Sequence, residues 1–238
     1  IGEGYSLESA IVDAHLTLMK LARENPEMEG MATTIVGAHL NKAKFQIGWV
    51  GDSRAYLVSK GHRITPLTTD HNQAQCLVDT EDLTVEEART HPSQRVLMQA
   101  VGVESDGWRV DLIESNIEEG DYLLLCSDGL TLHVNGDEIR DLALSSDDPN
   151  VVSEKLVELA NSRGGKDNVS VIVIIADLVE IEEKEACQEG KENQKEKDGR
   201  KLSPAFENLD AIRLIQGHIT VLFDRTTAGL PGKDLSGT

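Results

Sequence analysis

The stretch that most constrains the fold is a short apolar run at residues 122–126 (YLLLC), which follows a turn containing Gly120. Five apolar residues are too few for a stable helix but suit a buried β-strand. Asp128 and Gly129 come just after this run, so a carboxylate stands at the end of a strand, beside a residue that lets the backbone turn sharply. Such a position suits a ligand of a hard metal ion at the edge of a core.

A second carboxylate stands in a similar relation to another apolar run. Asp167 and Asn168 follow two glycines and precede residues 169–176 (VSVIVIIA), which are also strand-like. Two aspartates at the ends of buried strands can converge on one cation. Each pattern taken alone is more typical of an ordinary turn, because Asp, Asn and Gly are the residues that turns favour.

Two further acids occupy turn-like positions. Asp52 lies in the sequence GDSR, between strand-like residues 44–50 and 54–59, and Asp70 lies in the sequence TTDHN. The simplest interpretation of Asp52 is a hydrogen bond to the turn backbone or a pair with Arg54, rather than a direct bond to a metal.

Five motifs occur in an order and spacing that resemble the bacterial PPM-type serine/threonine protein phosphatases, which are the metal-dependent type 2C phosphatases. The motifs are GMATTIV (30–36), VGDSRAY (50–56), LTTDHN (67–72), GDYLLLCSDGL (120–130) and GKDNVS (165–170). The resemblance runs from about residue 6 to residue 177. It implies hydrolysis of phosphoserine and phosphothreonine by a water that two Mg²⁺ or Mn²⁺ ions activate, with a third ion in some members.

The resemblance also assigns roles to individual residues. Asp128 and Asp167 would bind one catalytic metal, and Asp70 together with Asp128 would hold a third and weaker one, near a mobile flap at residues 72–93. Three residues would support or shape the ligand loops without binding the catalytic metals themselves: Asp52, Gly129 and Asn168. No side chain would act as the nucleophile, because the metal-bound water has that role.

The beginning of the chain departs from the family pattern. In the family, an arginine that binds phosphate, a Glu-Asp pair and an Asp-Gly-x-Gly-Gly loop lie upstream of the helix that starts here near Ser6, and the chain contains none of them. The intact SDG and KDN motifs favour a phosphatase that lacks its N-terminal part, with this polypeptide inactive by itself. The alternatives are a catalytically inactive pseudophosphatase that binds a phosphoprotein or a metal, and an Asp-rich structural cation-binding domain.

Composition limits the partners. The chain has 42 acidic against 23 basic residues and a formal net charge of -19, which argues against nucleic acid and anionic membranes as partners. The resemblance implies instead a phosphorylated protein, the substrate of a serine/threonine kinase. The three cysteines, Cys76, Cys126 and Cys187, form no CxxC pair, and no segment has the pattern of a membrane span or signal peptide. These features predict a reducing, cytoplasmic location, with Cys126 in the core.

Periodicity predicts an α+β layered sandwich of antiparallel sheets and helices. The resemblance implies that its layers follow the order α-β-β-α, here without the N-terminal strands. Ser6 can cap a helix that ends before Pro26. Further helices are expected at 137–144 and 150–163, and two short ones between 72 and 93, where Thr84 and Glu87 form a capping box. Strands are expected at 33–40, 44–50 and 54–59, as an antiparallel meander, and at 108–114, 122–126 and 169–176.

The composition divides the chain into three parts. Residues 1–179 hold the phosphatase-like domain, and residues 180–201 mix Glu and Lys with few apolar residues, as a solvated linker or charged helix would. Residues 202–238 form a C-terminal extension of unknown role. Its apolar stretch at 209–223 allows a small docking element, although a loosely ordered extension is the simpler expectation.

Overall fold

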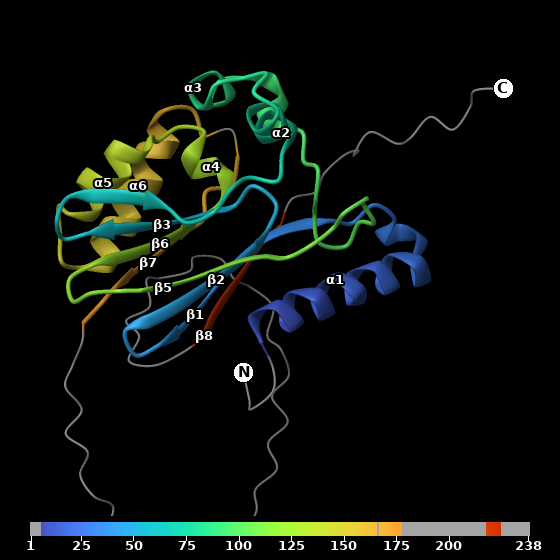
Figure 1. The fold of residues 1–238 in the computed structure, drawn as a ribbon, viewed down its shortest axis with the longest axis horizontal. Helices are drawn as coiled ribbons and strands as arrows, with labels where there is room; N and C mark the ends of the chain where they lie inside the picture. Colours follow the sequence, from blue (N-terminus) through green and yellow to red (C-terminus); the bar gives the residue numbers. More distant parts are fainter. Residues whose placement is uncertain (1–5, 166, 178–217, 225–238) are drawn as a thin grey trace, which may run out of the picture.

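Two antiparallel four-stranded sheets pack face to face, and helices lie on both outer surfaces (Figure 1). The computed structural model describes residues 6–165, 167–177 and 218–224. This arrangement confirms the predicted α+β sandwich of antiparallel sheets. The predicted linker at 180–201, Cys187 and most of the extension at 202–238 lie outside the described residues.

The first sheet has the strand order β5-β2-β1-β8. Its strands are β1 (Thr33–Asn41), β2 (Lys44–Val50), β5 (Asp111–Asn116) and β8 (His218–Asp224). All neighbours are antiparallel, with Gly37 opposite Gly48 in the central pair and Thr33 opposite Asp224 at the β8 edge. Residues 218–224, which overlap the end of the apolar stretch in the C-terminal extension, therefore add a strand to this sheet.

Helix α1 (Leu7–Glu24) covers part of the outer face of the first sheet. Ser6 caps it as predicted, since its hydroxyl accepts a hydrogen bond from the Ser9 amide. Leu7 and Ile11 are buried, and a Cβ at Gly48 of β2 would lie only 3.1 Å from a methyl carbon of each. The glycine therefore allows the helix to approach the sheet closely.

The second sheet has the strand order β4-β3-β6-β7. Its strands are β3 (Arg54–Ser59), β4 (Arg63–Pro66), β6 (Tyr122–Cys126) and β7 (Val171–Ile175). Its outer face carries α4 (Asp128–Thr131), α5 (Gly136–Ala143) and α6 (Pro149–Ser162), packed through an apolar cluster that includes Leu130, Ile139 and Leu156. Sequence periodicity predicted α5 and α6 to within one residue but missed the short α4 and β4.

The main core lies between the two sheets. Phe45 and Ile47 of β2 face Leu123 and Leu125 of β6 there, and all four are almost fully buried. The predicted meander is wrong at one place, because β3 pairs with β4 and β6 rather than with β2. The chain crosses from one sheet to the other at Gly51–Ser53, where the φ of Gly51 is +113°. A glycine adopts that conformation without the strain that other residues would bear.

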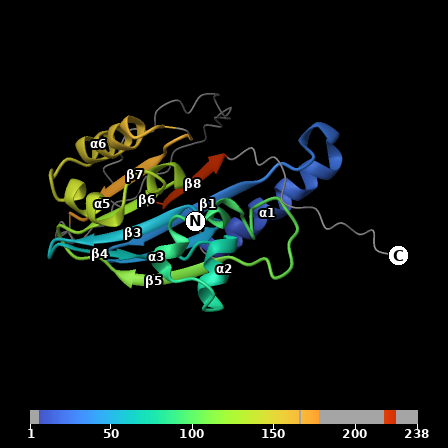
Figure 2. The ribbon, with the colours of Figure 1, turned by 90° about the horizontal axis from the view of Figure 1, so that it is seen from above.

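The predicted flap contains α2 (Gln73–Asp79), α3 (Val85–Ala88) and a 3-10 helix at Pro92–Arg95. The predicted capping box is present, since Thr84 and Glu87 bond each other's backbone amides. Seen from above, α2 and α3 lie apart from the layer of α5 and α6 (Figure 2). No helix within the described ranges is long and apolar enough to cross a membrane.

Candidate active site

Three of the predicted site residues lie in loops at the same end of strands β3, β6 and β7 of the second sheet. The last residue of β6, Cys126, lies opposite both Arg54, the first residue of β3, and Val171, the first residue of β7. The loops just beyond these three strand ends therefore lie side by side. They carry three of the predicted residues: Asp52, Asp128 and Asp167.

Ser127 joins two of these loops. Its buried hydroxyl donates a hydrogen bond to the Asn168 carbonyl at 3.2 Å and accepts one from the Ser170 amide at 3.1 Å. The Ser127 amide also donates to the Ser170 carbonyl at 3.0 Å. Three hydrogen bonds thus hold the segment that precedes Asp128 against the segment that follows Asp167.

Gly129 makes the approach of the two loops possible. A Cβ at this position would collide with the carbonyl oxygen of Asn168, so only glycine fits without a shift of the backbone. Asp128 is half-buried and begins α4, while Asp167 is exposed and accepts a hydrogen bond on Oδ1 from the Asn168 amide at 2.9 Å. Gly129 and Asn168 thus lie in close contact at the point where the two loops meet.

Asp70 is held by Arg54 and Asn72. The Arg54 guanidinium donates from Nε to Asp70 Oδ1 at 2.8 Å and from Nη2 to Oδ2 at 2.7 Å, and Asn72 Nδ2 donates to Oδ2 at 3.0 Å. The Asp70 side chain is 10% exposed and that of Arg54 is 32% exposed. Burial works to lower the pKa of Arg54, but the hydrogen bonds and charge of Asp70 raise it above its usual value. Arg54 therefore remains charged, and its ion-pair partner is Asp70.

Asp52 lies in the crossing between the sheets and is 4% exposed. The neighbouring Ser53 hydroxyl lies 2.8 Å from that of Thr34, a hydrogen bond that links the crossing to β1. Gly51, which precedes Asp52, packs so closely on Thr34 that a Cβ at Gly51 would lie 2.6 Å from the Thr34 Cβ. The backbone around Asp52 is thus tightly fixed beside the Asp128 loop.

Cys126 is a core residue, as predicted. It is completely buried, and burial raises the pKa of its thiol to about 12. A thiol that stays protonated is a poor nucleophile. The charges of Asp70 and Asp128 both act on this thiol, which places both carboxylates near the end of β6.

The oxygen donors at this edge suit a hard divalent cation. Asp128 and Asp167 supply carboxylates, the ligand type that Mg²⁺ and Mn²⁺ prefer, and such ions keep several water ligands. In the part of the chain that the structure describes, no three His, Cys, Asp or Glu side chains gather closely enough to hold a metal ion. The described residues thus fit such an ion in kind, and would supply only part of its ligands.

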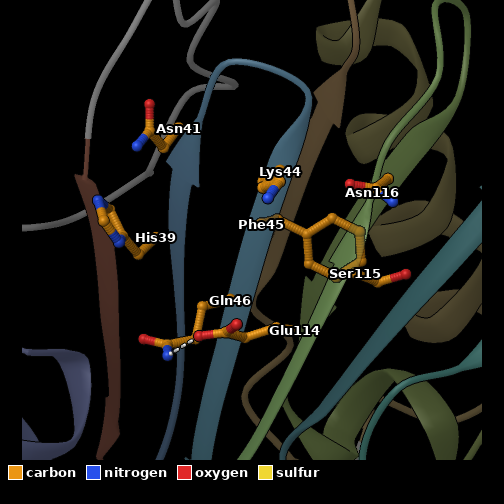
Figure 3. A pocket seen from close by; sticks show the side chains of 8 residues that line it. All are labelled: His39, Asn41, Lys44, Phe45, Gln46, Glu114, Ser115 and Asn116. Carbon is orange, nitrogen blue, oxygen red and sulfur yellow. Dashed lines mark hydrogen bonds between the residues drawn. The ribbon is translucent and has the colours of Figure 1, made fainter.

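A pocket of about 360 Å³ lies at the opposite end of the first sheet (Figure 3). It is lined by Phe45 and by polar residues of β1, β2 and β5, among them Lys44 at the start of β2. The candidate site lies beyond the other end of β2, at Val50. Gln46 of β2 donates a hydrogen bond at 2.8 Å to Glu114, which lies opposite it on β5. The pocket is therefore separate from the candidate site.

Sequence patterns missed the residues that hold the site together. Ser127 and Arg54 stood inside recognised motifs, but nothing local indicated that they bond Asn168 and Asp70. The hydrogen bond between His71 Nε2 and Asp111 Oδ2 joins residues 40 positions apart, and neither segment contained a signal for it.

Comparison with known proteins gives consistent matches. Residues 2–76 match the model of the family described as "Protein phosphatase 2C". The serine/threonine phosphatase stp of Listeria monocytogenes serovar 1/2a is 33% identical over 174 residues, which cover 73% of this chain and 68% of that protein. This chain thus spans about two thirds of the length of that relative.

Solved structures that resemble this chain are also serine/threonine phosphatases. The serine/threonine phosphatase Stp1 from Staphylococcus aureus is similar with a TM-score of 0.66 and 36% identity, over 70% of this chain and 65% of that one. The catalytic domain of the serine/threonine protein phosphatase PstP, solved in complex with two manganese ions, is similar with a TM-score of 0.61 and 31% identity, over 70% of this chain and 68% of that one.

Proposed function

Because the chain belongs to the protein phosphatase 2C family of metal-dependent serine/threonine phosphatases, we propose that it forms most of the catalytic domain of such an enzyme. Its substrates would be proteins that a serine/threonine kinase has phosphorylated, and the reaction would be hydrolysis of the phosphate ester. The observation that carries this proposal is the sheet edge where Ser127 ties the Asp128 loop to the Asp167 loop. Nothing in the comparisons favours a pseudophosphatase.

Asp128 and Asp167 would be ligands of one Mg²⁺ or Mn²⁺ ion. Support comes from their place at one sheet edge and from the PstP structure, which holds two manganese ions. When bound, a pair of such ions lowers the pKa of water and neutralises the phosphoryl oxygens during in-line attack. This chain would hold the two carboxylates together through the contacts among Ser127, Gly129 and Asn168.

Asp70 would, together with Asp128, hold an additional ion. Arg54 already donates to both oxygens of Asp70, so a cation there would meet the guanidinium charge at short range. Like charges repel, which agrees with a weaker site than that of Asp128 and Asp167. Asp52 would support the crossing that adjoins this site, and it need not bind a metal itself.

Partners and location follow from charge and cysteine chemistry. The net charge of -19 supports a protein partner rather than nucleic acid or an anionic membrane. Cys76 and Cys126 are free thiols, which agrees with a reducing compartment such as the cytoplasm and with a role in intracellular signalling.

The test is binding of Mn²⁺ and release of phosphate from a phosphothreonine peptide by the whole chain, with EDTA as the first control. We expect Mn²⁺ to raise the melting temperature of the wild-type protein but not that of Asp128→Ala or Asp167→Ala. Asp147→Ala, which removes a carboxylate on the loop between α5 and α6, is the matched control and should behave as wild type.

The peptide assay separates the alternatives. We expect little turnover by this polypeptide alone, and turnover once the missing family motifs are supplied upstream. Mn²⁺ binding with no turnover even then would support the pseudophosphatase. Equal stabilisation of wild type and both site variants by Mn²⁺ would contradict the assignment of Asp128 and Asp167.

A further inference from the structure

His71 is a buried histidine that the proposed chemistry does not use, and only 5% of its side chain is exposed. It forms two hydrogen bonds with Gly51. The His71 amide donates to the Gly51 carbonyl at 2.9 Å, and the Gly51 amide donates to the ring Nδ1 of His71 at 3.2 Å. This two-point contact joins the crossing that carries Asp52 to the segment that carries Asp70.

The other ring nitrogen of His71 faces a charged partner. Since Nδ1 accepts a hydrogen bond, the proton of a neutral ring is on Nε2, which lies 3.1 Å from Asp111 Oδ2 at the start of β5. Arg109 donates to both oxygens of Asp111, at 2.6 and 3.3 Å. Both ring nitrogens are thus engaged, and the ring has one defined orientation.

The backbone of His71 also contacts the segment that follows the flap. The Met98 amide donates to the His71 carbonyl at 2.8 Å, and Asn72, the next residue, forms a β-bridge with Leu97. Three segments that are distant in sequence therefore meet at His71. They are the crossing at 51–53, the segment at 70–72 and the segment at 96–98.

We propose that His71 is a positioning residue for the metal site, which fixes the Asp52 crossing and Asp70 relative to each other through Gly51 and Asp111. Packing alone does not account for its contacts, because an apolar residue would fill the same space without two directed hydrogen bonds. Residues that orient metal ligands from behind commonly change metal affinity about 10–100-fold when lost, and His71 would act in this way through the backbone next to Asp70.

The proposal rests on the proposed function only where it concerns metal, so its test has one readout that needs no metal. Hydrogen exchange of backbone amides in the metal-free chain reports the Gly51 bond directly. In His71→Ala we expect exchange at Gly51 to rise about fivefold to tenfold, as loss of one hydrogen bond implies. The amides of β6 should exchange as in wild type.

Two conservative variants separate the two ring nitrogens. Asn places a polar atom near the position of Nδ1, and Gln places one near Nε2, so His71→Asn should restore protection at Gly51 and His71→Gln should not. Asp111→Asn tests the second link, and we expect it to weaken Gly51 protection in part. His62→Asn is the matched control, because His62 is an exposed histidine in a turn with φ +63°.

The second readout is the dissociation constant for the weaker Mn²⁺ ion, the one proposed to bind at Asp70, measured with the same variants. We expect it to rise about tenfold in His71→Ala and to return close to the wild-type value in His71→Asn. Unchanged exchange at Gly51 in His71→Ala, or an equal rise in every strand, would overturn the proposal, as would an unchanged Mn²⁺ affinity. If the wild-type chain binds no Mn²⁺, the metal assignment fails and the exchange data alone decide the role of His71.

Discussion

Ser127→Ala is the sharpest test of how the candidate site is built. The change removes the hydroxyl that donates to the Asn168 carbonyl and accepts from the Ser170 amide. The Asn168 carbonyl then loses a donor, and the Ser170 amide, which is partly buried, loses its partner. An unsatisfied buried donor costs about 1–3 kcal/mol, and we expect the free energy of unfolding to fall by about that amount.

Urea denaturation measures the stability, and titration with Mn²⁺ measures the effect on the site. We expect Ser127→Ala to weaken Mn²⁺ binding as well, because the Asp128 and Asp167 loops are no longer joined by a side chain. Ser170→Ala is the matched control, since it keeps the backbone groups that bond Ser127. If Ser127→Ala unfolds at the urea concentration of that control and binds Mn²⁺ equally well, the hydroxyl does not join the loops as argued.

Gly129→Ala should cost about 1–3 kcal/mol and weaken Mn²⁺ binding, because its Cβ meets backbone, while Gly136→Ala, whose Cβ would make only ordinary contact with Ile64, should do neither. Arg54→Met should lower the free energy of unfolding by about 1.5–3 kcal/mol, seen in urea, because Asp70 loses charged donors; unchanged stability would contradict the ion pair. Burial lowers the pKa of His15 from 6.5, so the unfolded chain takes up this proton first and stability falls as pH falls below about 6.5. The urea midpoint should show this loss in wild type and less of it in His15→Gln.

Local signals predicted the elements well. The Ser6 cap, the capping box of α3 and the bounds of β6 all depend on residues within a few positions of one another. The error at β2 and β3 has a different cause. Two strands joined by a three-residue turn usually pair, but here β3 pairs with β4 and β6 in the other sheet, and the choice of partner depends on contacts between residues distant in sequence.

The candidate site shows the same contrast between features that local sequence predicts and features that depend on distant contacts. The acids at the strand ends were found because carboxylates beside glycines form a recognisable local pattern. The groups that hold them were not, because Ser127 and Asn168 are 41 positions apart, and Arg54 and Asp70 are 16 apart. Hydrogen bonds at such separations depend on the register of strands, which no local pattern states.

The register of β6 shows why these polar contacts matter to the fold as well as to the site. All five residues of β6 are buried, so apolar side chains point to both faces and alternation cannot decide which residue faces which layer. A slip by one residue exchanges the faces, and here it would exchange one apolar set for another. The polar residues at the two ends of the strand must therefore help to set the register.

Asp121 anchors one end, where its buried carboxylate accepts hydrogen bonds from the amides of Lys60 and Glu118, both at 3.1 Å. Ser127 anchors the other end through Asn168 and Ser170. A slipped β6 would leave both side chains without these partners, at a cost of about 1–3 kcal/mol for each buried polar group. Ser127, which joins the two loops of the candidate site, thus also helps to hold β6 in place. One residue therefore contributes both to the geometry of the site and to the register of the sheet.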